Sequence, residues 1–231
     1  MSTLHPTKKF FASLAVVAVA ALPLAACSSG SDSDSASESS SSSATPPKPV
    51  ASITALTGED TAVKLDKGFT DALTSLKLTP GTVGDGELVD GSLVFPITGG
   101  NVEVFKPGQV SPYVIGQIQH EGSGFSLEAG DTKVEITNLN VDPGVSRVYG
   151  DVSVNGEVAA TSAYIFTLNG STLKPLQSEG DTAVLEGTKV FISPVAADLL
   201  NKTFGTDAVT PDLLVGVAKI TVDTTSGDDG N

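Results

Sequence analysis

The chain has 231 residues, a formal net charge of −14 and 39% apolar residues, which suffices for one domain with a hydrophobic core. This acidity disfavours binding to nucleic acid and peripheral docking on anionic lipid. Cys27 is the only cysteine, so the chain can form no internal disulfide and no multi-cysteine metal site.

The N-terminal segment has the organisation of a secretory signal peptide. Residues 1–9 form a cationic leader that ends in Lys8 and Lys9, and residues 10–24 are largely apolar. The sequence Leu24-Ala25-Ala26-Cys27 follows and resembles a bacterial lipobox, which directs a diacylglyceryl chain to the cysteine thiol. We therefore expect residues 1–26 to be a cleaved signal peptide and Cys27 to be the site of lipidation, with palmitate-like acyl chains.

Two other interpretations of this segment remain open. An uncleaved transmembrane helix needs roughly 20 apolar residues, whereas this run is shorter and is interrupted by Ser13 and Pro23. An ordinary signal peptide with an incidental cysteine would leave a lone thiol in a secreted domain, which is unusual. The lipobox interpretation predicts a protein anchored by lipid on the extracytoplasmic face of a bacterial cell membrane.

Composition divides the remaining chain into a tether, a domain and a tail. Residues 27–49 consist almost entirely of Ser, Asp, Ala, Thr and Pro after the cysteine, so we expect a disordered tether. Residues 50–223 have the length and apolar content of a single domain, and residues 224–231 are expected to be a flexible acidic tail.

Two helices are expected within this domain. Apolar residues recur at helical spacing over residues 61–76, with Ala62, Leu65 and Phe69 on one face. The second helix should begin after Ser193-Pro194, because serine caps a helix N-terminus and proline is tolerated in the first turn. It should end at Gly205.

The rest of the domain is typical of short strands joined by tight turns. The expected strands are rich in Val, Ile, Tyr and Phe, and several alternate in period two. They span residues 101–104, 113–120, 133–136, 148–154, 162–168, 188–193 and 214–222. Asn155-Gly156 predicts a type I′ hairpin turn. The sequence thus predicts a mostly β fold, either a β-sandwich or a partly closed barrel with two short helices.

The shortage of histidine argues against most enzyme mechanisms. His5 lies in the signal segment, so His120 is the only histidine left after cleavage. A serine triad would need a nucleophile elbow that is absent, and zinc enzymes use two or three His or Cys ligands. A carboxylate mechanism of the glycosidase kind stays formally open. We expect no catalytic residues, no metal site and a non-enzymatic protein.

His120 has two interpretations. It can be a histidine near the end of a half-buried strand, hydrogen-bonded to a neighbour such as Glu121, or it can be an axial ligand or a pH-sensitive group. Tyr113, Tyr149 and Tyr164 are more often core or rim residues of a sheet. Among these side chains, His120, Tyr113 and Tyr149 are the candidate ligands.

Four short segments of the domain carry a family resemblance, residues 67–72, 116–122, 138–142 and 187–193. These segments resemble the HtaA family, the haem-transport-associated domains of actinobacterial surface proteins. The resemblance implies a β-rich envelope domain and haem as a cofactor.

The sequence departs from the family where it would bind haem. Ala72 stands in place of the tyrosine of the family's Ser-Phe-x-x-Tyr motif, and His120 precedes Gly122 instead of following a glycine. From the residues alone no cofactor is predicted. We expect a lipid-anchored envelope protein whose domain binds a ligand or partner at the cell surface. An HtaA-like haem-binding lipoprotein and a structural or adhesive envelope protein are the alternatives.

Overall fold

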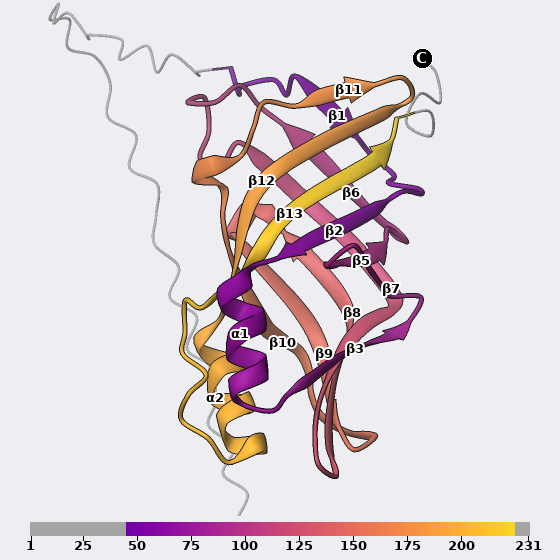
Figure 1. The fold of residues 1–231 in the computed structure, drawn as a ribbon. Coiled ribbons are helices and arrows are strands. Elements are labelled where there is room, and N and C mark those ends of the chain that lie inside the picture. The colour runs from indigo at the N-terminus through magenta and orange to yellow at the C-terminus, as the bar shows by residue number, and fades with distance from the viewer. Residues whose placement is uncertain (1–44, 225–231) are drawn as a thin grey trace, which may run out of the picture. The chain divides into compact units, whose positions relative to one another are not determined.

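The computed structural model describes residues 45–224, so the predicted signal peptide, Cys27, most of the tether and all but the first residue of the tail lie outside the described residues. The described part is mostly β with two α-helices, as the sequence predicts (Figure 1). The strands are β1 Ala51–Ile53, β2 Asp60–Leu65, β3 Thr79–Gly84, β4 Glu87–Val89, β5 Ser92–Pro96, β6 Gly99–Val104, β7 Val114–Ala129, β8 Thr132–Asp142, β9 Arg147–Val154, β10 Glu157–Asn169, β11 Gln177–Glu179, β12 Thr182–Ile192 and β13 Leu214–Asp223. The helices are α1 Lys67–Ser75 and α2 Pro194–Phe204, and two 3-10 turns span Pro143–Val145 and Gly170–Thr172.

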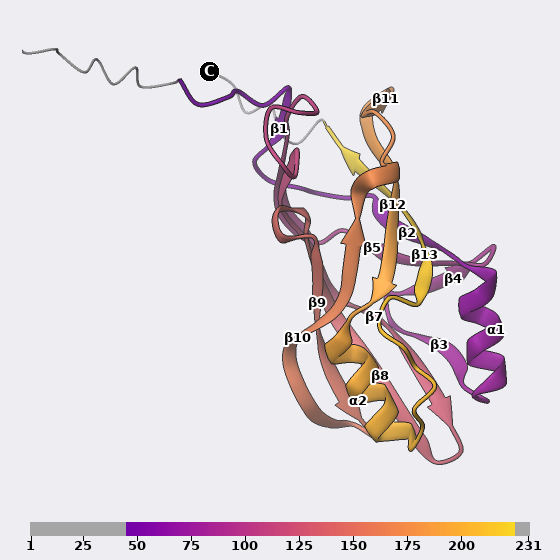
Figure 2. The same cartoon turned by 90° about the vertical axis from the view of Figure 1, so that its left-hand side faces the viewer.

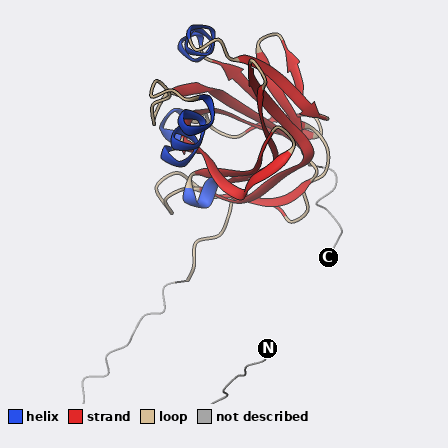
Figure 3. Cartoon of the chain, turned by 90° about the horizontal axis from the view of Figure 1, so that it is seen from below, coloured by secondary structure: helices blue, strands red, loops and turns tan. Residues whose placement is uncertain are grey.

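All of these strands belong to one antiparallel sheet that curls into a half-barrel. The strand order is β1-β6-β7-β8-β9-β10-β12-β13-β2-β5-β4, with β3 added beside β7 and β11 beside β12. Viewed from below, the strands curve around an interior (Figure 3). Long strands of this kind point alternate side chains into and out of the curve, so one face of the sheet supplies the core.

A short corner beside β7 links two strands that lie near opposite ends of the strand order. Residues 97–98 connect β5, near one end of the order, to β6, near the other. The corner is fixed to β7 because the backbone N–H of Thr98 donates to the carbonyl oxygen of Gln119 at 2.9 Å. This corner brings the end of β5 against the middle of β7, where His120 lies.

The first helix differs from the prediction. Residues 61–65 belong to strand β2, which pairs with β13 and β5, and α1 begins only at Lys67. Asp66 caps the helix, since its Oδ1 accepts a hydrogen bond from the N–H of Gly68 at 2.7 Å. Phe69 and Leu73 are its buried residues. The spacing of apolar residues before Asp66 favours a helix, but these residues form a strand because they pair with neighbouring strands on both edges of β2.

The second helix is confirmed. The Oγ of Ser193 accepts from the N–H of Ala196 at 3.0 Å, Pro194 occupies the first turn, and Gly205 ends the helix in the left-handed conformation with φ of 64°. Both helices lie at the same end of the half-barrel (Figures 1 and 2). Ala196, Ala197 and Leu200 are the buried residues of α2.

The predicted type I′ turn is confirmed as well. Asn155 and Gly156 join β9 to β10 with φ of 51° and 83°, and both values are positive as this turn requires. All seven predicted strands are present, and most extend further than predicted; β7 continues nine residues beyond His120 to Ala129. No helix among residues 45–224 is long and apolar enough to cross a bilayer.

Candidate functional site

A cavity of about 140 Å³ lies inside the curve of the sheet. Its wall is built mainly from aliphatic and aromatic side chains of β2, β5, β7, β8, β12 and β13. The lining side chains include Val63, Phe95, Ile118, His120, Phe125, Leu139, Phe166, Val190 and Val215. Tyr113, Ser146 and Leu173, which lie in or beside loops, line it as well and are partly exposed to solvent. Apolar cavities of this size accept molecules as large as benzene.

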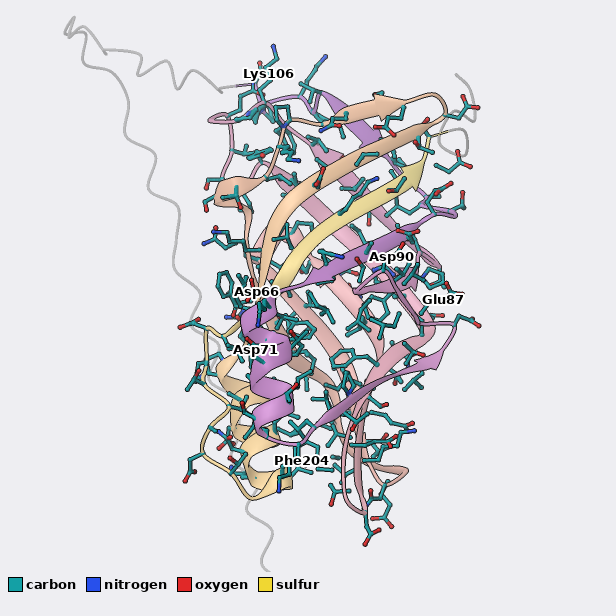
Figure 4. The ribbon with its side chains drawn as sticks, in the orientation of Figure 1. Asp66, Asp71, Glu87, Asp90, Lys106 and Phe204 are labelled. Carbon is teal, nitrogen blue, oxygen red and sulfur yellow. The ribbon has the colours of Figure 1, made fainter. Side chains whose placement is uncertain are left out.

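Charged side chains are absent from this lining. No Asp, Glu, Lys or Arg is among the residues around the cavity. Of the charged residues labelled in Figure 4, Glu87 and Lys106 lie at the edge of the domain, and Glu87, Asp90 and Lys106 are all exposed. The cavity therefore suits a mostly apolar, uncharged group.

His120 is the most buried titratable side chain of the cavity wall, with 1% of its surface exposed. It lies on β7, where the register with β8 shifts between His120 and Gly124. Gly124 is needed at this bulge, because a Cβ there would lie 2.2 Å from the carbonyl oxygen of Ile136. The bulge contains Ser123, which is fully buried and whose hydroxyl donates to the carbonyl oxygen of His120 at 3.1 Å.

The imidazole of His120 is held by the corner after β5. Its Nδ1 lies 2.9 Å from the carbonyl oxygen of Pro96. A carbonyl oxygen can only accept, so Nδ1 carries the proton and donates. The ring also contacts Phe95, with centroids 6.2 Å apart. The sequence-based hydrogen bond to Glu121 and the position near a strand end are both wrong, since the partner is Pro96 and β7 continues well beyond His120.

The other ring nitrogen of His120 has no hydrogen-bond partner. Nε2 is fully buried and unpaired, and with the proton on Nδ1 it presents a lone pair. Burial lowers the pKa of His120 from its usual 6.5, although the carbonyl groups of Pro96 and Phe95 oppose that shift. The imidazole is consequently neutral near pH 7 and able to accept a hydrogen bond or to ligate a metal.

Thr61 supplies a second unpaired polar atom to the same cavity. Its Oγ1 is buried without a partner, and the residue is 5% exposed. Thr61 lies opposite Phe95 in the pairing of β2 with β5. Buried polar atoms without partners are costly, and in native proteins they often mark a place where a ligand or water completes the bonding. Sequence analysis missed Thr61 because it was assigned to a helix.

Of the two candidate tyrosines, the structure places one in the cavity wall and the other outside it. Tyr113 lines the cavity together with His120. Tyr149 is not among the lining residues; its ring contacts the ring of Tyr164 at 6.1 Å, and the Tyr164 ring stacks under the Arg147 guanidinium at 4.5 Å. Within residues 45–224 no group of three or more His, Cys, Asp or Glu side chains could hold a metal ion.

No family model and no curated protein matches the chain. Among solved structures, the C-terminal domain of HtaA from Corynebacterium glutamicum is similar with 14% identity and a TM-score of 0.48, covering 74% of this chain and 98% of that domain. HtaB from the same organism, a haem-binding protein, is similar with 8% identity and a TM-score of 0.44, covering 75% of this chain and 96% of HtaB.

Proposed function

We propose that the domain is a binding module that takes a mostly apolar ligand into the cavity and contacts it through Nε2 of His120. The observation that carries the proposal is the fully buried Nε2 with no partner in the wall of an apolar cavity. The bond from Nδ1 to Pro96 fixes the ring, so the lone pair of Nε2 is ready to accept from a ligand hydroxyl or amide without reorganisation.

The lipid anchor gives this module its location. With Cys27 acylated and the domain on a short tether, the protein would bind its ligand at the extracytoplasmic face of the membrane. His120 is hydrogen-bonded to no nucleophile or carboxylate in the cavity wall, which supports binding in preference to catalysis.

Haem is a second candidate ligand, and one feature of His120 favours it. A histidine that ligates a metal usually donates its other ring N–H to a carbonyl or carboxylate, which fixes the tautomer and orients the ring. His120 has this arrangement with Pro96. Nε2 would hold the iron, but a porphyrin is several times larger than this benzene-sized cavity, so the cavity wall would have to open for haem to bind. The cavity wall offers no cation to the two propionates, so these groups would have to remain in solvent.

Two titrations test the proposal. Wild-type protein should bind an apolar fluorescent probe that carries a hydroxyl group, with one probe per protein. The variant His120→Phe fills the same space but lacks Nε2. It should bind this probe about tenfold more weakly, which corresponds to the loss of one buried hydrogen bond. Tyr149→Phe is the matched control, since Tyr149 does not line the cavity and its substitution should leave affinity unchanged. Equal binding by wild type and His120→Phe would contradict the role of Nε2.

Ferric haem is titrated in parallel and followed by visible absorbance. A Soret band that His120→Ala shifts or removes would identify haem as the ligand of Nε2. Tyr113→Phe tests whether Tyr113 is the ligand of haem in place of His120, because a phenolate ligand would be lost only in that variant. Binding of neither the apolar probe nor haem would exclude both candidate functions.

A further inference from the structure

A second, smaller cavity lies beside the first inside the same sheet. Its volume is about 30 Å³, and its wall is almost entirely aliphatic. The lining residues are Ala51, Ser52, Ile53, Val102, Val104, Ile118, Leu176, Ala183, Leu185, Ile220 and Val222. It lies where β1 and β6 face the ends of β12 and β13.

Three side chains belong to the walls of both cavities. Ile118 on β7, Leu185 on β12 and Ile220 on β13 each line the first and the second cavity. Leu185 and Ile220 lie directly opposite each other in the pairing of β12 with β13. The partition therefore consists of aliphatic side chains without hydrogen bonds, which can change rotamer without breaking a polar contact.

The combined lining restricts the charge of an occupant. Neither wall contains Asp, Glu, Lys or Arg, and Ser52 is the one polar residue of the second cavity. An ionised group placed in this interior would lose its hydration without gaining a partner, which is strongly unfavourable. An occupant that spans both cavities must be neutral and apolar along its length.

We propose that the two cavities are successive segments of one tunnel for a single short linear hydrocarbon chain with a neutral polar group, an alcohol of about five or six carbon atoms, which matches the combined volume of the two cavities. The inference rests on the proposed binding function and specifies its ligand. A chain passes the partition when Ile118, Leu185 and Ile220 move aside, whereas a broad rigid molecule of the same apolar area does not. The neutral polar group suits the unpaired Nε2 of His120 and Oγ1 of Thr61.

The test is an affinity series of linear alcohols, measured by calorimetry on the acylated or detergent-solubilised full chain. In wild type, affinity should increase about fourfold for each methylene group that enters the tunnel, which corresponds to about 0.8 kcal/mol. The increase should stop when the chain end has filled the second cavity. Hexanoate, ionised at neutral pH, should bind more weakly than hexanol.

Variants of the second cavity locate the chain end. Ala183→Phe places a ring in the second cavity, so short alcohols should bind as in wild type while the increase with length stops at a shorter chain. Ala51→Leu, on the edge strand β1, should act in the same direction if Ala183→Phe folds poorly. Ala159→Phe, an exposed position on β10, is the matched control and should leave the whole series unchanged.

The possible outcomes separate this inference from the proposed function. An identical length dependence in wild type and both second-cavity variants would overturn the tunnel and leave binding in the first cavity intact. Tighter binding of hexanoate than of hexanol would overturn the neutral-ligand assignment. If no alcohol binds while haem does, the tunnel is excluded and the haem candidate stands; if nothing apolar binds, both proposals fail.

Discussion

Nδ1 of His120 donates a hydrogen bond to the carbonyl oxygen of Pro96 at 2.9 Å, at the corner that connects β5 to β6. This bond determines both the tautomer and the orientation of the only histidine among the described residues. It leaves Nε2 as a buried acceptor in the cavity wall, so the same contact that joins β7 to this corner also prepares the proposed binding site.

Stability should fall when the pH is lowered from neutrality through the range just below 6.5. Burial depresses the pKa of His120 below 6.5, so the unfolded chain takes up a proton before the folded one. Stability that is present above pH 6.5 is therefore lost as the pH falls toward the folded pKa. Urea unfolding of wild type and His120→Asn at a series of pH values measures this loss. Parallel pH profiles of the two proteins would show that His120 is not the titrating group.

The hairpin between β9 and β10 should depend strongly on Gly156. Nothing lies within 4 Å of a Cβ placed there, so the effect of Gly156→Val comes from the backbone φ of 83°. Holding a β-branched residue in that conformation should cost about 1–3 kcal/mol.

Asn155 in the same hairpin makes a separate contribution. Its Oδ1 accepts from the N–H of Lys133 at 2.8 Å. Asn155→Gly keeps the turn and loses that bond, which should cost about 0.5–1.5 kcal/mol. Thermal unfolding of the two variants compares the costs, and a Gly156→Val protein as stable as wild type would contradict the type I′ assignment.

Ser193 should be the most sensitive cap in the domain. Its hydroxyl accepts from Ala196 and also donates to the carbonyl oxygen of Tyr164 at 2.5 Å, and the residue is fully buried. Ser193→Ala removes both bonds and should cost about 2–3 kcal/mol. Asp66→Ala, which removes a single cap bond at α1, is the comparison and should cost about 1 kcal/mol. Equal losses in denaturant unfolding would mean that the bond to Tyr164 contributes nothing.

The anchor prediction concerns Cys27, outside the described residues. Cys27→Ala should abolish acylation and leave the protein unprocessed or released into the medium, because a lipobox predicts the thiol as the acceptor of the lipid. Metabolic labelling with a radioactive fatty acid, followed by detergent partition, measures both effects. Wild-type protein that carries no label and stays in the aqueous phase would exclude the lipobox.

The sequence predicts local structure well where the signal is local. Ser193-Pro194 with Gly205 and the Asn155-Gly156 turn each depend on neighbouring residues, and each is confirmed. The prediction was wrong for residues 61–65. Their apolar spacing fits a helix, but they form a strand because they pair with β13 and β5, which are distant in sequence. Strand β3 was missed since Pro80, Gly81 and Gly84 disfavour a strand, and only pairing along β7 forms it.

The site was only partly predictable for the same reason. His120 could be selected because it is the one histidine left in the predicted mature chain, and Tyr113 because it is aromatic and begins the predicted strand of residues 113–120. The hydrogen-bond partner of His120 could not be predicted, because Pro96 lies 24 residues away in the sequence and reaches His120 only through the curl of the sheet. Thr61 has no sequence signal at all; its unpaired hydroxyl is visible only once the cavity is known.

The nitrogen NMR spectrum of histidine-labelled protein tests the central claim most directly. The account predicts that His120 at neutral pH is neutral, with its proton on Nδ1, and that a bound hydroxyl-bearing apolar ligand shifts the Nε2 resonance of His120 while Nδ1 stays bonded to Pro96. A proton on Nε2, or an Nε2 resonance that does not change when ligand is bound, would contradict it.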